Sequence, residues 1–245
     1  MVKTTRVFWG TTANAGLKFS GRPQHSAPMK RLRPVLLLAL VLGLIAGCAH
    51  REPANLLPHK QKLRAYVESG RYQQRIADVA LEANKYLLRR LKQPVKGKPA
   101  IVFDIDETTL TNLPTILEQD FGYVPKVWDA WVNRAQSRAI LPVQTVYETA
   151  VRNGVAVIFI TGRREDQRAA TERNLRDVGY DTWDQLHFKP DDITLSTGTF
   201  KKRLRQQLIK DGYVILANIG DQDSDFVDGH AEAEFRLPNP FYLTR

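Results

Sequence analysis

Two carboxylates, Asp104 and Asp106, stand two residues apart directly after the apolar run 99–103. In a β-strand, residues two apart point to the same side, so both side chains can address one spot where the strand ends. Open α/β folds bind their ligands at this carboxyl edge of the sheet. Three further polar groups stand at a predicted strand end or helix start: Thr161 with Gly162, Lys201, and Asp221 with Asp225.

These residue types suit the hydrolysis of a phosphate monoester, one of the slowest uncatalysed reactions. A carboxylate can attack phosphorus and form an acyl-phosphate, which divides one difficult step into two. Lys201 adds a fixed positive charge that stabilises developing negative charge, and Thr161 with backbone N–H groups can bind phosphoryl oxygens. Asp106 is placed to protonate the leaving oxygen and later to deprotonate the attacking water.

The same acidic residues suit Mg²⁺, which prefers oxygen ligands in octahedral geometry. The cation would offset the repulsion between an attacking carboxylate and the phosphate dianion. Asp104, the main-chain carbonyl of Asp106 and Asp221 can supply three ligands. Asp225 lies one helical turn after Asp221, so it can face the same site and hold a metal-bound water. We therefore expect a magnesium site at this edge.

Short β-rich runs alternate with helical patterns of ten or more residues after residue 98. This alternation predicts an α/β fold, in which a parallel sheet carries helices on both faces. A helix with apolar residues at helical spacing between Ile76 and Leu88 precedes the first strand. The expected strands are 99–104, 155–160, 186–188, 213–219 and 233–237, and the expected helices between them are 142–153, 165–178 and 199–211.

The polar groups resemble the four motifs of the haloacid-dehalogenase (HAD) superfamily of phosphotransferases. The resemblance is closer to its acid-phosphatase branch, which includes plant vegetative storage proteins and bacterial surface lipoprotein acid phosphatases. It spans about residues 99–242. The matching segments are DIDET (104–108), NLP (112–114), WDAW (128–131), ITGR (160–163), GY (179–180), FK (200–201), GY (212–213), NIGDQ (218–222), SD (224–225) and LPNPFY (237–242).

The resemblance implies a HAD-like Rossmannoid sheet with a small helical cap inserted at about 110–141. It also implies Asp104 as nucleophile, Asp106 as acid/base, and Mg²⁺ at Asp104, Asp106 and Asp221. The expected activity is a Mg²⁺-dependent acid phosphatase acting on small phosphomonoesters such as nucleoside monophosphates. The alternative is a surface lipoprotein that mainly binds or stores, with residual phosphatase activity.

Several side chains in and around the expected cap keep two interpretations. Trp128 and Trp131 can stack on a substrate ring or pack in the core, and Asn112 can bind substrate or cap a turn. Solvated or structural roles are favoured for Arg163 and Arg164. Of the adjacent pair Lys201 and Lys202, we expect Lys201 to point inward; the family often has a small polar residue at position 202, which leaves open which lysine reaches the phosphate.

The net charge of +10 at pH 7 could indicate a nucleic-acid partner, but the charge is unevenly distributed. The first 47 residues hold seven Lys or Arg and no acid. Removing these seven leaves 29 basic residues against 26 acidic ones, a net charge of +3. Basic patches interleaved with aromatic residues are also lacking in the rest of the sequence, so nucleic-acid binding is disfavoured.

The basic leader resembles a bacterial lipoprotein signal peptide at residues 29–47, with a positive start and an apolar run too short to span a bilayer. Small residues precede Cys48, the only cysteine, which implies cleavage before it and lipid attachment to its sulfur. A buried core cysteine is the alternative. We expect 1–28 to be a misassigned extension, 48–58 a tether and 59–245 the phosphatase domain. Ala49 after the cysteine points to the outer membrane.

Overall fold

The computed structural model describes residues 53–190 and 194–244. The expected signal peptide, the lipidation site Cys48 and the first part of the tether lie outside these residues. Within the described ranges, every helix is too short or too polar to span a bilayer. The first described helix begins at Leu57, two residues before the expected start of the phosphatase domain.

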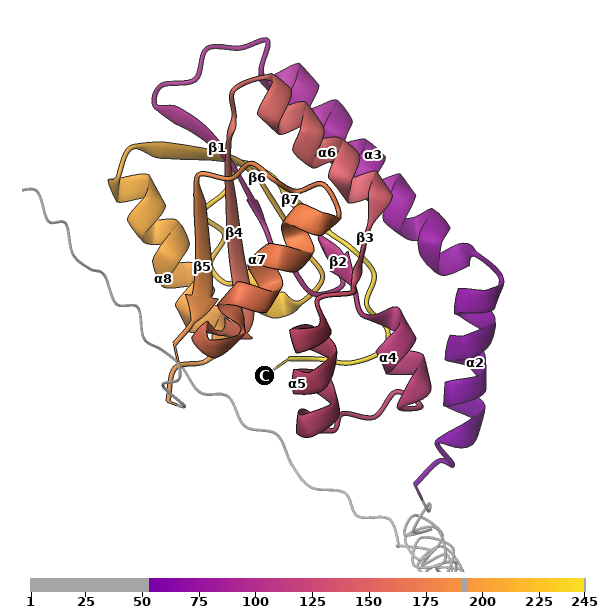
Figure 1. Cartoon of the computed structure of the whole chain (residues 1–245). Helices are drawn as coiled ribbons and strands as arrows, with labels where there is room; N and C mark the ends of the chain where they lie inside the picture. The colour runs from indigo at the N-terminus through magenta and orange to yellow at the C-terminus, as the bar shows by residue number, and fades with distance from the viewer. Residues whose placement is uncertain (1–52, 191–193, 245) are drawn as a thin grey trace, which may run out of the picture. The chain divides into compact units, whose positions relative to one another are not determined.

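A five-stranded parallel sheet carries this part of the chain, with strand order β5-β4-β1-β6-β7 (Figure 1). All four strand pairings are parallel, so the carboxyl ends of the strands face one edge. The central strand β1 ends one residue before Asp104. The predicted α/β fold is therefore confirmed. The strands are β1 (Lys98–Phe103), β4 (Ala156–Arg164), β5 (Gln185–Lys189), β6 (Tyr213–Gly220) and β7 (Glu234–Arg236).

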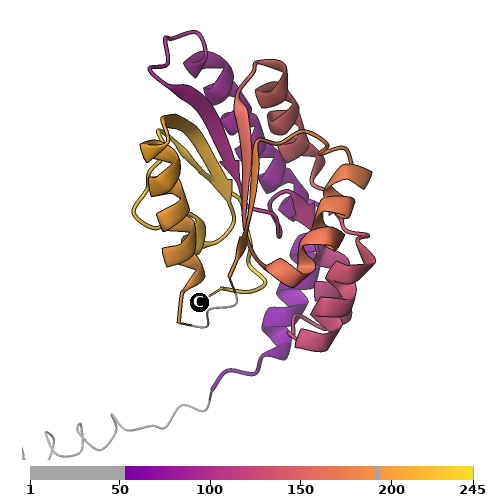
Figure 2. The ribbon, with the colours of Figure 1, turned by 60° about the vertical axis from the view of Figure 1, so that its left-hand side comes forward.

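Helices cover both faces of this sheet, because the strands are apolar on both sides. Ile101 and Phe103 of β1 pack in one core cluster with side chains of α3, α6 and α7. Ala100 and Val102, which alternate with them, pack on the other face with α8. Figure 2 shows α8 on one side of the sheet and the remaining helices on the other. The helices are α2 (Leu57–Glu68), α3 (Arg71–Arg90), α6 (Leu141–Arg152), α7 (Arg168–Asp177) and α8 (Thr197–Lys210).

The segment between β1 and α6 contains two short helices and a two-stranded ribbon. The ribbon pairs β2 (Leu110–Thr111) with β3 (Arg138–Ala139) in antiparallel register. Between them lie α4 (Leu113–Glu118) and α5 (Pro125–Arg134). Each helix has proline in its first turn, where the missing N–H costs nothing. This segment occupies the stretch 110–141 that was expected to form a cap.

The chain around residue 161 differs from the expected pattern. Strand β4 continues to Arg164, because Arg164 pairs with Lys189 of β5 after an irregularity in the ladder. A 3₁₀ turn, η2 (Glu165–Gln167), follows before α7 begins at Arg168. The Gln167 side chain accepts the backbone N–H of Arg164 at 3.2 Å. The predicted helix 165–178 therefore begins three residues late.

Candidate active site

Asp104 lies at the carboxyl end of the central strand and is 7% exposed. Its backbone N–H donates to the carbonyl of Ile219 on β6, and its carbonyl accepts the hydroxyl of Thr109. These bonds fix the main chain on both sides of the side chain. The Lys201 ammonium, delivered by α8, donates to Oδ1 of Asp104 and, at 2.5 Å, to Oδ1 of Asp225.

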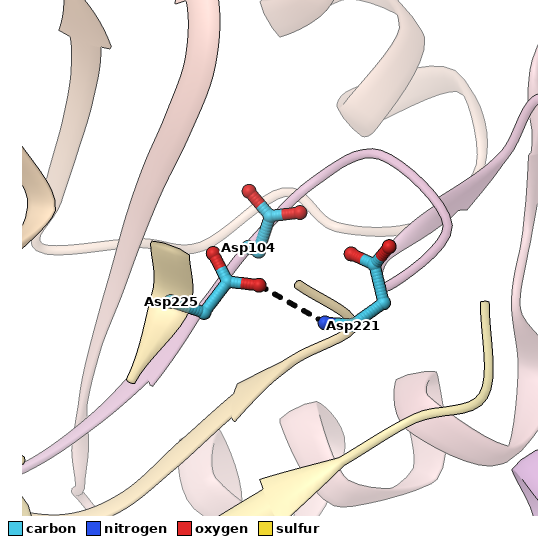
Figure 3. A group of neighbouring side chains, drawn as sticks. All are labelled: Asp104, Asp221 and Asp225. Carbon is cyan, nitrogen blue, oxygen red and sulfur yellow. Dashed lines mark hydrogen bonds between the residues drawn. The ribbon is translucent and has the colours of Figure 1, made fainter. Parts of the chain in front are cut away.

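Asp104, Asp221 and Asp225 form a buried acidic cluster (Figure 3), in which one oxygen of each carboxylate lies within 4.8 Å of the others. Asp225 sits in η3 (Asp223–Asp225) after β6, and its Oδ2 accepts the backbone N–H of Asp221 at 3.0 Å. A Cβ at Gly220 would lie 2.3 Å from that oxygen. Glycine at 220 therefore leaves room for the Asp225 carboxylate at the end of β6.

Asp221 is held by three donors. Its Oδ2 accepts N–H groups from the side chains of Gln222 at 2.6 Å and Asn239 at 2.7 Å. Its Oδ1 accepts the hydroxyl of Thr108 at 3.2 Å. The carboxylate plane is thus fixed from both ends, which is the usual support of a metal-binding carboxylate.

The cluster is strongly electronegative, because three buried carboxylates face the single ammonium of Lys201. Burial raises the pKa of Asp104 well above its usual range, against the pull of Lys201. Burial and then the charge of Asp225 raise the pKa of Asp221 to about 7. A divalent cation would balance the two excess negative charges, and carboxylate oxygens are the donors that hard cations take. The residues present therefore fit such an ion.

The three carboxylates differ in how many hydrogen bonds they accept: Asp221 and Asp225 accept three each, and Asp104 accepts one. Its Oδ1 accepts Lys201, and its Oδ2 accepts the N–H groups of both Asp221 and Gln222. Asp104 has only its Oδ1 engaged by Lys201. Asp104, with one oxygen open, therefore suits direct contact with a metal ion or a substrate, while the direct role of Asp221 and the water-mediated role of Asp225 stay predictions.

Asp106 pairs with Arg163 rather than with the acidic cluster. The guanidinium donates to Asp106 Oδ1 through Nη2 at 2.7 Å and to both oxygens through Nε. The Arg163 side chain is only 1% exposed and also donates to Thr171 at 3.0 Å. Of the two roles favoured for Arg163, solvated or structural, the structural one fits, because the buried Arg163 orients Asp106.

Asn112 and Trp131 lie behind Asp106. Asn112 donates to Asp106 Oδ1 at 2.8 Å, while its own oxygen accepts Trp131 Nε1 at 2.8 Å and the hydroxyl of Ser137 at 3.0 Å. Neither Asn112 nor Trp131 lines the cavity described below, whereas Trp128 does. Their predicted contact with substrate stays a prediction, and their observed role is to support Asp106.

The remaining predicted residues lie on β4 and α8. Thr161 is buried, and its hydroxyl accepts the N–H of Arg163 at 3.1 Å. Gly162 lines the cavity next to Thr197 of α8. Lys202 pairs with Asp228, so Lys201 is the lysine that reaches the acidic cluster.

A cavity of about 450 Å³ opens in front of these groups. Asp104, Asp106, Lys201 and Asp221 supply its polar end. The rest of the lining is mixed. Its polar side chains include Gln119, Arg163, Arg164 and Gln167, and its aromatic and aliphatic side chains come from α4, α5, the connection between them and the residues after β7. The apolar lining residues are Ile116, Phe121, Tyr123, Trp128, Phe241 and Leu243.

The segment 237–244 contributes one wall of this cavity through residues 241–244, and sequence reasoning assigned its residues no individual role. Asn239 contacts Asp221, and the Tyr242 hydroxyl donates to Glu107 Oε2 at 2.7 Å. Glu107 is buried with φ of 52°, and burial followed by the charge of Asp106 raises its pKa to about 7. The sequence signal that could have pointed to these contacts was the match of LPNPFY (237–242) to the family.

Comparison with known proteins points to one family. The model of the HAD superfamily, subfamily IIIB (acid phosphatase), matches residues 50–245. Acid phosphatase 1 of Solanum lycopersicum is 30% identical over 203 residues, which cover 78% of this chain and 79% of that protein. This outcome confirms the resemblance inferred from the motifs.

Other plant relatives carry different names. The Stem 28 kDa glycoprotein of Glycine max is 37% identical over 155 residues, covering 60% of this chain and 61% of that protein. Vegetative storage protein 1 of Arabidopsis thaliana is 33% identical over 145 residues, covering 58% of this chain and 54% of that protein. The chain thus spans less than two thirds of the length of these two relatives.

Among solved structures, the Class C acid phosphatase from Bacillus anthracis shares the fold. Its TM-score is 0.63 at 26% sequence identity, and the match covers 75% of this chain and 86% of that one.

Proposed function

This chain belongs to the HAD superfamily, subfamily IIIB (acid phosphatase), and on that premise we propose that it hydrolyses phosphate monoesters through an aspartyl-phosphate. One observation carries the proposal: Lys201 contacts the buried carboxylate of Asp104 beside Asp221 and Asp225, and Asp104, Lys201 and Asp221 line one cavity together with aromatic side chains. A nucleophile, a cation and candidate metal ligands therefore converge where a phosphate would enter.

Asp104 attacks phosphorus through one oxygen of its carboxylate, and its other oxygen stays available to Lys201 and to a metal ion. The new O–P bond forms as the bond from phosphorus to the leaving oxygen breaks, and Lys201 stabilises charge on the phosphoryl group. In the second step a water attacks phosphorus, and the bond between phosphorus and Asp104 breaks. Free phosphate leaves and the Asp104 carboxylate is restored.

Asp106 moves the protons. Its Oδ1 is held by Arg163 and Asn112, whereas Oδ2 receives only the longer contact of 3.2 Å from Arg163 Nε. Oδ2 is thus the atom that gives a proton to the leaving oxygen and then takes one from the attacking water. Arg163 and Asn112 hold the carboxylate in place through both steps.

We propose Mg²⁺ as the cofactor. Asp104, Asp221 and the main-chain carbonyl of Asp106 would hold it, with Asp225 bound to one of its waters. When bound, the ion supplies charge that offsets the repulsion between the Asp104 carboxylate and the phosphate dianion. Aromatic walls at Phe121 and Trp128 favour flat apolar leaving groups, so small aryl esters and nucleoside monophosphates are the proposed substrates.

The test is phosphate release from an aryl phosphate with Mg²⁺ and with EDTA, at acidic to neutral pH. We expect turnover that EDTA abolishes, and its loss in Asp104→Asn with an unchanged circular dichroism spectrum. Asp78→Asn, which changes an exposed carboxylate on α3, is the control variant. Near-wild-type turnover by Asp104→Asn would remove the aspartyl-phosphate.

The second candidate is a binding or storage role, supported by the similarity to Vegetative storage protein 1 of Arabidopsis thaliana. Absence of metal-dependent turnover across a panel of nucleotides, sugar phosphates and phosphoamino acids would favour it.

We further propose lipid anchoring at Cys48 in a bacterial outer membrane, supported by the sequence of the leader alone. In a bacterial host, wild-type protein should fractionate with outer membranes and Cys48→Ala should not. Equal fractionation of the two proteins would refute the anchor.

A further inference from the structure

The connection between α4 and α5 has an unusual backbone. Asp120 has φ of 50° and the next residue, Phe121, has φ of 62°. The left-handed region is unfavourable for residues with a Cβ, and two in succession are uncommon outside glycine-rich turns. Neighbouring contacts must therefore hold this turn in place.

Helix α2 provides those contacts. The Lys60 ammonium donates to Asp120 Oδ2 at 2.7 Å, and Arg64 Nη2 donates to Asp120 Oδ1 at 3.0 Å. The same Arg64 nitrogen donates to the carbonyl of Leu117, in the last turn of α4, at 3.1 Å. Hydrogen bonds from Lys60 and then from Arg64 lower the pKa of Asp120, which favours the charged form that makes these contacts.

The turn in question places an aromatic wall of the cavity. Phe121 lines the cavity and stacks on Phe241, with ring centroids 5.9 Å apart and planes at 17°. The Arg64 guanidinium lies 5.4 Å from the centre of the Phe121 ring. Phe241 in turn meets Tyr72 of α3 edge-on at 5.0 Å. The wall is thus supported from α2 and α3, outside the segment that carries Phe121.

We propose that Asp120, through Lys60 and Arg64 of α2, is a positioning residue for the aromatic wall that Phe121 and Phe241 form beside the leaving group. This inference rests on the proposed phosphatase function of the cavity. Loosening the turn lets the Phe121 ring leave its stack on Phe241, which weakens binding of a flat apolar leaving group. Lys60, Arg64 and Asp120, which we call the clamp, are not among the residues that line the cavity. The chemical step at Asp104 is therefore unaffected.

The clamp is tested with Asp120→Asn and with the double variant Lys60→Gln/Arg64→Gln. Asp78→Asn, which removes a carboxylate from an exposed pair on α3, is the matched control. KM and kcat are measured for para-nitrophenyl phosphate and for glycerol phosphate, which has no ring. Both clamp variants should raise KM for the aryl ester by about two- to fivefold, the range expected for exposed ion pairs.

The pattern of effects separates positioning from general destabilisation. We expect unchanged kcat for the aryl ester and unchanged constants for glycerol phosphate. Adding Asp120→Asn to the double variant should have no further effect, because both cationic partners of Asp120 are then already gone. Asp120→Glu, which keeps the charge, should restore much of the affinity. Equal changes for both substrates, or none for the aryl ester, overturn the clamp.

A calorimetric titration with phenylphosphonate distinguishes failure of the clamp proposal from failure of the proposed phosphatase function. Wild-type protein that binds phenylphosphonate without hydrolysing either ester would refute the phosphatase. The clamp is then judged on the ratio of Kd values between Asp120→Asn and wild type, which should be about two to five on the same grounds. A Kd ratio of one, or no binding of phenylphosphonate by the wild type, would refute the clamp.

Discussion

Replacing Asn239 with alanine should weaken the binding of a divalent cation while leaving the sheet intact. Asn239 Nδ2 donates to Asp221 Oδ2 at 2.7 Å, and Asp221 is 4% exposed, so water does not readily replace the lost donor. After the substitution only Gln222 holds that oxygen. The carboxylate can then rotate away from the face that Asp104 and Asp221 share.

The expected size follows from the lost contact. A hydrogen bond to a buried charged group contributes about 1.5–3 kcal/mol. Since each factor of ten corresponds to about 1.4 kcal/mol, Kd should rise roughly ten- to a hundredfold. The same range, about 10–100-fold, is typical for loss of a side chain that supports a metal ligand.

The assay is a calorimetric titration of chelator-treated, substrate-free protein with Mg²⁺, repeated with Mn²⁺. Asn239 also accepts the backbone N–H of Phe241 at 3.0 Å, so alanine removes a turn as well. Asn239→Asp keeps that acceptor but loses the donor, and should bind metal at least as weakly as Asn239→Ala. Tyr242→Phe, which removes one hydrogen bond to Glu107 and none to Asp221, is the control for disturbance of the same segment.

Wild-type metal affinity in both Asn239 variants would refute the reasoning, because it would show that Gln222 and Thr108 suffice to orient Asp221. Equal losses in Tyr242→Phe and Asn239→Asp would also refute it, since the segment as a whole, and not the amide donor, would then be responsible.

Two other predictions concern Arg163 and His187. Lysine cannot reproduce the two-nitrogen contact that Arg163 makes with Asp106. In Arg163→Lys, kcat should therefore fall about ten- to a hundredfold, a large part of what general acid–base catalysis contributes. A wild-type kcat in steady-state kinetics would contradict this prediction. Burial and then the charge of Arg168 lower the pKa of His187 below its ordinary value of 6.5, so the unfolded chain binds more protons in mild acid and the free energy of unfolding falls as pH drops through 6.5. His187→Gln should reduce this loss, measured as the shift in urea midpoint between neutral and mildly acidic pH; an equal shift in both proteins would contradict the assignment.

The fold could be predicted because local patterns decide it. The run 99–103 is apolar on both faces, and the structure buries Ile101 and Phe103 on one side and Ala100 and Val102 on the other. Such a strand fits only the interior of a sheet with two helical layers. The expected helix at 165–178 was placed too early, because the ladder between Arg164 and Lys189 extends β4 past Thr161.

The gathering of the main polar residues at one edge could also be predicted from strand ends, but their partners could not. Asp104 and Asp106 both line the cavity, yet β1 ends at Phe103, so the alternation of a strand does not govern their directions. One carboxylate meets Lys201 and the other meets Arg163. Charge and burial after folding, rather than spacing, decide which cation each receives.

Contacts made by the last described segment were hidden for a different reason. Tyr242 reaches Glu107 across 135 residues, and Asn239 reaches Asp221 across 18. An isolated Asn between two prolines predicts only a turn. Its role appears when the segment is laid against the carboxyl edge of the sheet.

The wall formed by residues 237–244 makes activity a late event in folding. A chain whose sheet has formed but whose segment 237–244 has not docked holds Asp104 and Lys201, yet it has an open cavity and an incompletely held Asp221. The segment follows β7 directly, so it can dock only after β7 has paired with β6. During refolding, phosphate release should therefore recover after the far-UV signal, and incompletely folded chains would leave phosphate esters untouched.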